Sequence, residues 1–134
     1  RRTMNTELEY PKDKQPAIRL VLMPRDTNAV GTIFGGVILS YIDLAAATEA
    51  HLQHPGKLVT VAFDQVEFKQ PVFVGDLVSF FTDTLRIGRT SITVSVSVWA
   101  QRSSDRTKFA HVTEARVTMV AVDEQMHPTP IVHV

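Results

Sequence analysis

Asp43 is the residue of this chain whose setting points most directly to chemistry. It is the only charged residue from Phe34 to Thr48, a segment made mainly of apolar side chains. An ionised carboxylate among apolar neighbours is costly unless it is paired, hydrated or used in a reaction. Such a group can take a proton from water or attack an electrophilic carbon itself. A structural role is the alternative, with a loop amide or an arginine such as Arg19 or Arg25 satisfying the carboxylate.

Two adjacent glycines, Gly35 and Gly36, stand at the start of the same segment. Amide N–H groups at a helix start lack intrahelical partners and can bind an anion, and glycine lets a ligand oxygen approach the backbone closely. Asn28, in the polar loop upstream, offers a side-chain amide that donates and accepts hydrogen bonds. Turn geometry would equally explain the glycines, and an Asx-turn or a helix cap would explain Asn28.

Hydrophobic periodicity indicates the elements that must position these residues. We expect a helix from about Gly36 to Gln53, apolar nearly all round and therefore buried. Alternating, β-branched and aromatic stretches predict five strands: Ile18 to Met23, Leu58 to Lys69, Leu77 to Ile87, Ser91 to Ala100 and Lys108 to Val122. Short turns favour antiparallel pairing, and a helix apolar on all sides must be wrapped by a sheet. The predicted class is α+β, a curved antiparallel sheet of about five strands around one long central helix.

The length of 134 residues predicts one domain, which we place at residues 17–123, between a flexible N-terminal arm (1–16) and a C-terminal tail (124–134). The 14 basic and 14 acidic residues cancel and are scattered, so neither nucleic acid nor a membrane surface is an expected partner. No apolar run approaches the roughly 20 residues of a membrane span. Without cysteine the chain has no thiol nucleophile and no disulfide framework, and we expect a cytoplasmic protein.

Other side chains carry weaker signals. His51 and His54 have metal-like spacing near the expected helix end, but no third ligand is evident nearby, so no metal site is predicted. The serine and threonine side chains from Ser91 to Ser97 lack a Gly-x-Ser-x-Gly elbow and are interpreted as the outer face of a strand.

A series of short motifs resembles the hotdog-fold acyl-CoA thioesterases, and within them the short, single-domain YciA-type acyl-CoA hydrolases. The motifs keep their order from Ile18 to about Val122. They are Met-Pro-Arg-Asp-Thr-Asn28-Ala-Val-Gly31-Thr-Ile-Phe-Gly35-Gly36, Tyr-Ile-Asp43, Val59-Thr60-Val61, Phe68-Lys69-Gln70-Pro71-Val72, Val74-Gly75-Asp76, Gly88-Arg89-Thr90-Ser91-Ile92 and Thr113-Glu114-Ala115.

The resemblance implies roles for individual positions. Asp43 becomes the catalytic carboxylate, with Asn28 in the same pocket, and the Gly35 and Gly36 amides polarise the thioester carbonyl. Thr60 matches a pocket position. By default it would be an ordinary strand residue.

The resemblance also implies that Gly88, Arg89 and Ser91 contact coenzyme A. Without it, the Gly88-Arg89 pair is an ordinary hairpin turn. The side chains of Tyr41, Leu39, Phe63 and Phe68 are plausible walls for an acyl chain.

The implied reaction is hydrolysis of acyl-CoA to a free carboxylic acid and coenzyme A, with no cofactor beyond the coenzyme A of the substrate. Asp43 would act as general base or as nucleophile, and the sequence favours neither. One alternative is a hotdog acyl-thioester hydratase or dehydratase, but these usually use a loop histidine and none precedes His51. Another is a non-catalytic acyl-CoA sensor, for which the arm of 16 residues is too short to hold a DNA-binding segment.

The spacing of Gly35 and Asp43 bears on assembly. They are eight residues apart, so about 12 Å separates them along a helix axis. Both would have to lie within about 3 Å of one reacting carbonyl or its water. If both are used, Asp43 of one subunit must meet Gly35 of another, which predicts a homodimer as the minimal active unit and allows a trimer of dimers.

Overall fold

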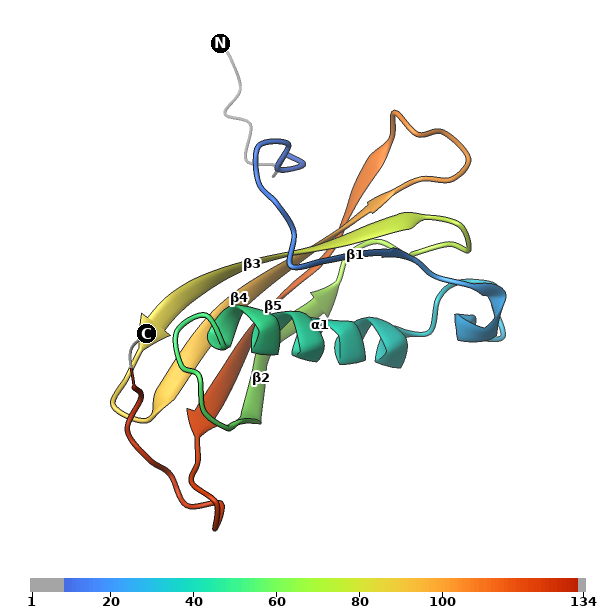
Figure 1. The fold of residues 1–134 in the computed structure, drawn as a ribbon. Coiled ribbons are helices and arrows are strands. Elements are labelled where there is room, and N and C mark those ends of the chain that lie inside the picture. Colours follow the sequence, from blue (N-terminus) through green and yellow to red (C-terminus); the bar gives the residue numbers. More distant parts are fainter. Residues whose placement is uncertain (1–8, 133–134) are drawn as a thin grey trace.

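A computed structural model describes residues 9–132 and places one long helix against one antiparallel sheet (Figure 1). The elements are β1 (Ile18–Val21), the 3-10 turn η1 (Pro24–Asp26), α1 (Gly35–Ala50), β2 (Leu58–Phe68), β3 (Leu77–Ile87), β4 (Ser91–Gln101) and β5 (Phe109–Ala121). The strands lie in the order β1-β3-β4-β5-β2, and every neighbouring pair is antiparallel. The predicted α+β fold with five strands and a single helix is confirmed.

The core lies between α1 and the inner face of the sheet. On β4 the strict alternation puts Ile92, Val94, Val96, Val98 and Ala100 on that face, each with 0% exposure. The facing side of α1 is made of Ile38, Ile42, Ala45, Ala46 and Ala50, all 0% or 1% exposed. Because three of these five are alanines, the helix can approach the β4 valines closely.

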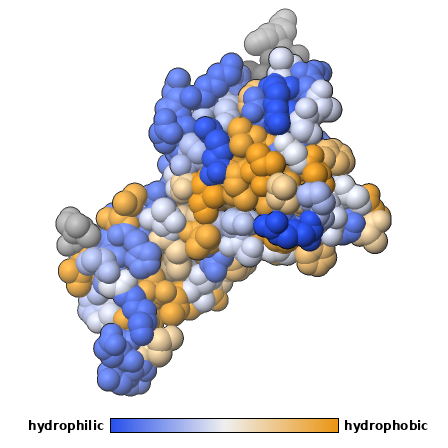
Figure 2. All heavy atoms as spheres, turned by 45° about the vertical axis from the view of Figure 1, so that its right-hand side comes forward, coloured by the Kyte–Doolittle hydropathy of each residue, from blue (hydrophilic) through white to orange (hydrophobic). Residues whose placement is uncertain are grey.

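The helix differs from the expectation in two ways. It ends at Ala50 instead of Gln53, because the amides of Leu52 and Gln53 donate to the carbonyls three residues back, at Glu49 and Ala50, before Pro55. It is also not buried all round, since Leu44 is 55% exposed and Phe34, just before the helix, is 57% exposed. The reason is that the sheet covers only one side of α1. Figure 2, which turns the start of α1 forward, shows broad apolar surface on this side of the molecule.

The outer face of the sheet carries the predicted serines and threonines, but it also buries an aromatic cluster. Tyr10 stacks on Phe109 with ring centroids 4.2 Å apart and meets Phe81 and Trp99 edge-on. Trp99 is 5% exposed as a result. The described part of the predicted arm therefore packs against the sheet, while residues 1–8 lie outside the described range.

One buried carboxylate ties two connections together. Asp76, 1% exposed, accepts hydrogen bonds from the amides of Phe73 and Ser103, both at 2.9 Å. Its other close partner is the Arg102 guanidinium at 2.7 Å. The loop before β3 is thereby fixed to the β4–β5 hairpin.

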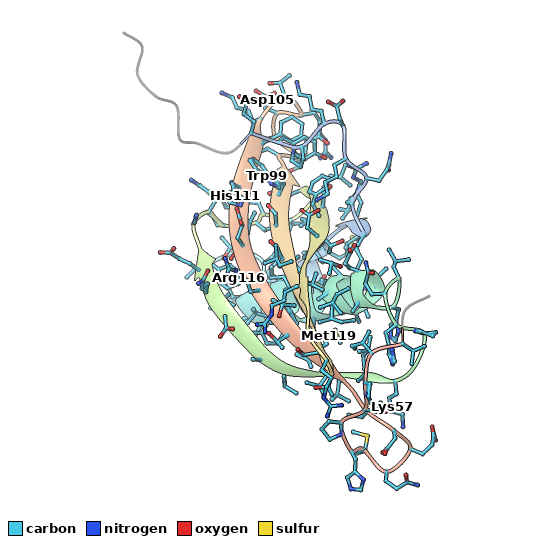
Figure 3. The ribbon with its side chains drawn as sticks, turned by 90° about the vertical axis from the view of Figure 1, so that its left-hand side faces the viewer. Lys57, Trp99, Asp105, His111, Arg116 and Met119 are labelled. Atoms are coloured by element: carbon cyan, nitrogen blue, oxygen red, sulfur yellow. The ribbon has the colours of Figure 1, made fainter. Side chains whose placement is uncertain are left out.

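A half-buried histidine lies on the outer face beside Trp99 (Figure 3). The His111 ring stacks on Trp99 at 4.7 Å, and its Nε2 lies 3.2 Å from the Glu114 carboxylate and 3.4 Å from Ser97 Oγ. Burial lowers the pKa of His111 below its ordinary value of 6.5; Glu114 opposes this shift and Lys69 adds to it. No helix within residues 9–132 is long and apolar enough to cross a membrane.

We expect Asp76→Ala to destabilise the fold by about 3 to 5 kcal/mol, because it leaves the Arg102 charge and two amides without their partner. Asp83→Ala is the matched control, since Asp83 forms an exposed ion pair with Lys14, a kind of pair worth about 0 to 1 kcal/mol. Urea unfolding at fixed protein concentration measures both. An equal decrease in the free energy of unfolding for the two variants would contradict the role given to Asp76.

The lowered pKa of His111 predicts a pH dependence of stability. The unfolded chain takes up a proton at higher pH than the folded chain, so the stabilisation present above about pH 6.5 is lost as the pH falls through the folded-state pKa. Replacing the titrating ring in His111→Gln should flatten the dependence of the urea midpoint between pH 7.5 and 5. His127→Gln, at an exposed histidine in the tail, should keep the wild-type slope; the same slope in all three proteins would refute this assignment.

Candidate functional site

Asp43 lies on the side of α1 that faces β2. Its Oδ1 accepts a hydrogen bond from Thr60 Oγ1 at 2.5 Å, and this is the only hydrogen bond to the carboxylate within residues 9–132. The same range contains no ion pair to Asp43, and Arg19, one alternative partner, donates to Ser79 and Tyr10 instead. The carboxylate is half-buried, and its Oδ2 has no hydrogen-bond partner in the described part of the chain.

Thr60 reaches Asp43 because β2 is irregular at this point. Thr60 pairs with Met119 and Ala62 with Thr118, so the residue between them, Val61, has no partner on β5. A β-bulge of this kind bends a strand and redirects its side chains. The sequence singled out Thr60 only through the family resemblance, because its contact with Asp43 depends on how β2 lies against α1.

The start of α1 carries the two amides expected to bind an oxygen anion. The neighbouring amides have acceptors: Phe34 N–H donates to the Asp26 carbonyl at 2.7 Å and Val37 N–H to the Phe34 carbonyl at 3.0 Å. Among the described residues the amides of Gly35 and Gly36 donate no hydrogen bond. They are therefore the free donors of this helix start, as the first turn of a helix provides.

A cavity of about 300 Å³ lies beside Gly35. Its apolar walls include Ile33, Ile38, Phe68 and Val72. Phe68 was among the side chains predicted to enclose an acyl chain, whereas Ile33, Ile38 and Val72 were missed. Their convergence depends on the chain crossing that puts the loop before α1 against the β2–β3 connection, shown by the Ile33 amide donating to the Val72 carbonyl at 2.8 Å.

Asn28 organises the loop that leads into α1. Its Oδ1 accepts from the amides of Val30 and Thr32 at 3.0 and 3.1 Å, and its Nδ2 donates to Thr32 Oγ1 at 2.9 Å. Asn28 therefore forms the Asx-turn type of contact that the sequence analysis gave as its structural alternative. Both acceptor positions of the oxygen are used, but the second Nδ2 hydrogen has no acceptor among the described residues, so the side chain can still donate one hydrogen bond to a ligand.

The candidates fall into two groups, one at the start of α1 and the other between the middle of α1 and the first residues of β2. Gly35, Gly36 and Asn28 lie at one end, where a Cβ on Gly35 would meet the Phe68 ring at 3.7 Å. Asp43 and Thr60 lie about 12 Å further along the helix axis. One chain does not bring the two groups together.

The Gly88–Ser91 turn lies at the same end of the sheet as Thr60, the residue that binds Asp43. Thr60 and Ile92 both lie opposite Met119 of β5, so the strand that follows the turn is two strand spacings, about 10 Å, from β2. The turn is closed by the Gly88 amide donating to the Ser91 carbonyl at 2.8 Å.

A larger hollow, about 750 Å³, lies at the β4–β5 hairpin. Its lining includes Trp99, Asp105 and His111, which are labelled in Figure 3. It is lined by Lys69, Arg102 and Lys108 together with Trp99 and His111, and it contains none of the predicted site residues. Within residues 9–132 no three side chains of the metal-binding types cluster. Size alone therefore does not identify the site.

Comparison with known proteins agrees with this architecture. The sequence profile of the Thioesterase superfamily matches residues 30–105. An uncharacterized acyl-CoA thioester hydrolase of Buchnera aphidicola subsp. Baizongia pistaciae is 42% identical over 127 residues, 93% of each chain. The acyl-CoA thioester hydrolase YciA of Salmonella typhimurium is 34% identical over 128 residues, 94% of this chain and 96% of its own.

Among solved structures, a hexameric hotdog fold thioesterase of Campylobacter jejuni superposes with a TM-score of 0.82 at 46% identity, covering 88% of this chain and 90% of the other. The profile spans more than half of the chain, and the relatives span nearly all of it. By fold and by sequence, this chain belongs to the thioesterase superfamily.

Proposed function

We propose that this protein hydrolyses acyl-CoA to a free carboxylic acid and coenzyme A. The observation that carries the proposal is the pair of free Gly35 and Gly36 amides beside an apolar cavity. Thioester hydrolysis needs such donors for the developing oxyanion and an apolar slot for the acyl chain. The names of the similar hydrolases from Buchnera and Salmonella support the same activity.

The site residues divide the chemistry between them. The thioester oxygen accepts hydrogen bonds from the Gly35 and Gly36 amides and from the free Nδ2 hydrogen of Asn28. These bonds strengthen as negative charge grows on that oxygen, and the positive end of the α1 dipole adds to them. Collapse of the tetrahedral intermediate then breaks the carbon–sulfur bond and releases coenzyme A.

Asp43 supplies the attack in one of two balanced ways. As a general base it takes a proton from water, the resulting hydroxide adds to the carbonyl carbon, and the proton passes to the leaving thiolate. As a nucleophile it forms a mixed anhydride with the acyl group, which water then hydrolyses. In both routes Thr60 holds Oδ1 and leaves Oδ2 to act.

We also propose that the working unit is a homodimer with shared sites. β2 is an edge strand, and its apolar residues Val61, Phe63 and Phe68 are 57%, 41% and 45% exposed. Two copies of β2 paired antiparallel around Asp64 would set the Thr60 end of one strand against the Phe68 end of the other. Because Thr60 holds Asp43 and Phe68 adjoins Gly35, each pairing would complete two sites. The similar Campylobacter thioesterase is hexameric, which supports further assembly of such dimers.

Each site would then draw Asp43, Thr60 and the Gly88–Ser91 turn from one subunit and the Gly35 end from the other. Arg89 is an exposed cation on that turn, suited to the phosphates of coenzyme A. The reaction as proposed uses water and substrate alone, with no separate cofactor, nucleic acid or membrane. Location in the cytoplasm stays a prediction from the cysteine-free sequence.

Asp43→Asn should lower kcat by roughly 10² to 10⁴, because the amide neither accepts a proton nor attacks the carbonyl. Thr60→Val should lower it less, and Thr60→Ser should retain most activity by keeping the hydroxyl. Thiol release from acetyl-, butyryl- and palmitoyl-CoA measures all three, with Asp83→Asn as the surface control. Wild-type rates in Asp43→Asn would refute the assignment.

The same assay separates the alternative functions. A sensor would bind acyl-CoA without releasing thiol, and a hydratase would change the acyl chain without freeing thiol.

Gly35→Pro tests the oxyanion donor, since proline fits the first position of a helix but lacks the N–H. We expect a loss of roughly 10² to 10³ in kcat, whereas Gly35→Ala keeps the donor and should stay near wild type. Its added Cβ would make only ordinary contact with Phe68 at 3.7 Å.

Mixing inactive variants tests the shared site. Co-expressed Asp43→Asn and Gly35→Pro subunits should regain about a quarter of wild-type activity, because half of the dimers are mixed and each mixed dimer holds one intact site. No recovery from folded, mixed dimers would show that one chain completes the site alone.

A further inference from the structure

We infer that the end of the tail, residues 128–132, is a strap that positions the Gly88–Ser91 turn for the coenzyme A end of the substrate. The inference rests on the proposed function. In Figure 1 the tail folds back after β5 and runs beside the β3–β4 turn and the C-terminal end of α1. The strap thus hydrogen-bonds both to the turn and to His54, which lies just after α1.

The strap is tied to the turn through backbone hydrogen bonds. The Ile131 amide donates to the Arg89 carbonyl at 2.8 Å. Just before it, the Thr129 amide donates to the Ala121 carbonyl, and the Ala121 amide donates to the Thr90 carbonyl, both at 2.9 Å. The carbonyls of two consecutive turn residues, Arg89 and Thr90, are therefore held from the C-terminal side of the chain.

The other end of the strap is held by a buried histidine after α1. His54 is 4% exposed, and its Nδ1 accepts the Val132 amide at 2.9 Å. The ring must therefore carry its proton on Nε2. Gly56 makes room for this ring, because a Cβ there would come within 2.7 Å of Nε2. His54 thus has a function that its metal-like spacing to His51 did not suggest.

The strap links the turn to the helix that carries Asp43. The Ile131 side chain packs against the hydrophobic core, so the strap is held by burial as well as by hydrogen bonds. Lys57 lies at the same end of the sheet (Figure 3), where its carbonyl accepts the Val122 amide at 3.0 Å. Two exposed cationic residues, Lys57 and Arg89, therefore accept hydrogen bonds at their carbonyls from the chain after β5.

Positioning of this kind predicts a specific kinetic signature. The turn would contact the nucleotide part of the substrate, far from the reacting carbonyl, so its contacts would be equally strong in the ground state and the transition state. Losing such uniform binding raises KM and leaves kcat unchanged. If the strap only stabilised the fold, its loss would change the kinetic constants of all substrates alike.

The experiment compares two thioesters with the same acyl group: butyryl-CoA and butyryl-N-acetylcysteamine, which lacks the nucleotide. The variants are His54→Leu, which removes the acceptor; His54→Asn, whose Oδ1 can replace Nδ1; and a chain ending at Pro130, which removes Ile131 and Val132, the donors to Arg89 and His54. Met126→Ala, at a 55% exposed residue of the same tail, is the matched control. Melting temperature and oligomer mass verify folding.

For butyryl-CoA we expect KM to rise roughly tenfold in His54→Leu and in the shortened chain, the effect of one lost hydrogen bond. The kcat should stay within about twofold, and the short thioester should be unaffected. His54→Asn and Met126→Ala should match wild type. Equal changes for both thioesters, or an unchanged KM for butyryl-CoA in a folded shortened chain, would overturn the inference.

Free coenzyme A separates this inference from the proposed function. Calorimetry should show roughly tenfold weaker binding to the shortened chain than to wild type. If wild type binds coenzyme A in this strap-dependent way yet releases no thiol from either thioester, the hydrolase proposal fails and the strap stands. If both proteins bind coenzyme A equally, the strap inference fails whatever the catalytic result.

Discussion

The packing of α1 along the inner face of the sheet is the constraint on which the rest of the structure depends. Alanines at positions 45, 46 and 50 let the helix settle onto the fully buried valines of β4. Because interiors pack at near-crystalline density, that fit fixes both the rotation of the helix and its position along the sheet. Gly35 then adjoins Phe68, and Asp43 meets Thr60. Two contacts that the proposed site uses within each chain therefore follow from this one fit.

The polar groups left without partners lie where the proposed chemistry needs them. The buried carboxylate of Asp76 has three donors, and no buried side-chain polar atom among the described residues lacks a hydrogen bond. By contrast, the Gly35 and Gly36 amides and one oxygen of Asp43 have no acceptor or donor within the described residues. Stability favours satisfying such groups. That they remain free at the start and in the middle of α1, beside an apolar cavity and near an edge strand, supports the proposed shared site.

Local periodicity predicted the elements well and their surroundings less well. Alternation in β4 identified its buried face, and the run of apolar residues identified α1. The expectation of a helix buried all round was wrong for one chain, since composition does not say how many sides a single sheet covers. The sequence predicted that the arm and the tail lie outside the domain. Tyr10 of the arm and Ile131 of the tail nevertheless pack against it. Their partners are distant along the chain, and no local pattern encodes such contacts.

The sequence by itself determined the strands, the helix, the lone carboxylate and the distance between Asp43 and the helix start, because these follow from side-chain period and from the fixed rise of an α-helix. Only the tertiary structure decided that Thr60 binds Asp43, that Asn28 keeps a donor but no acceptor, and that His54 holds the tail. The physical reason is register. A β-bulge at Thr60 and a chain that folds back after β5 bring together residues far apart in sequence, and a shift of one residue would turn each side chain to the opposite face.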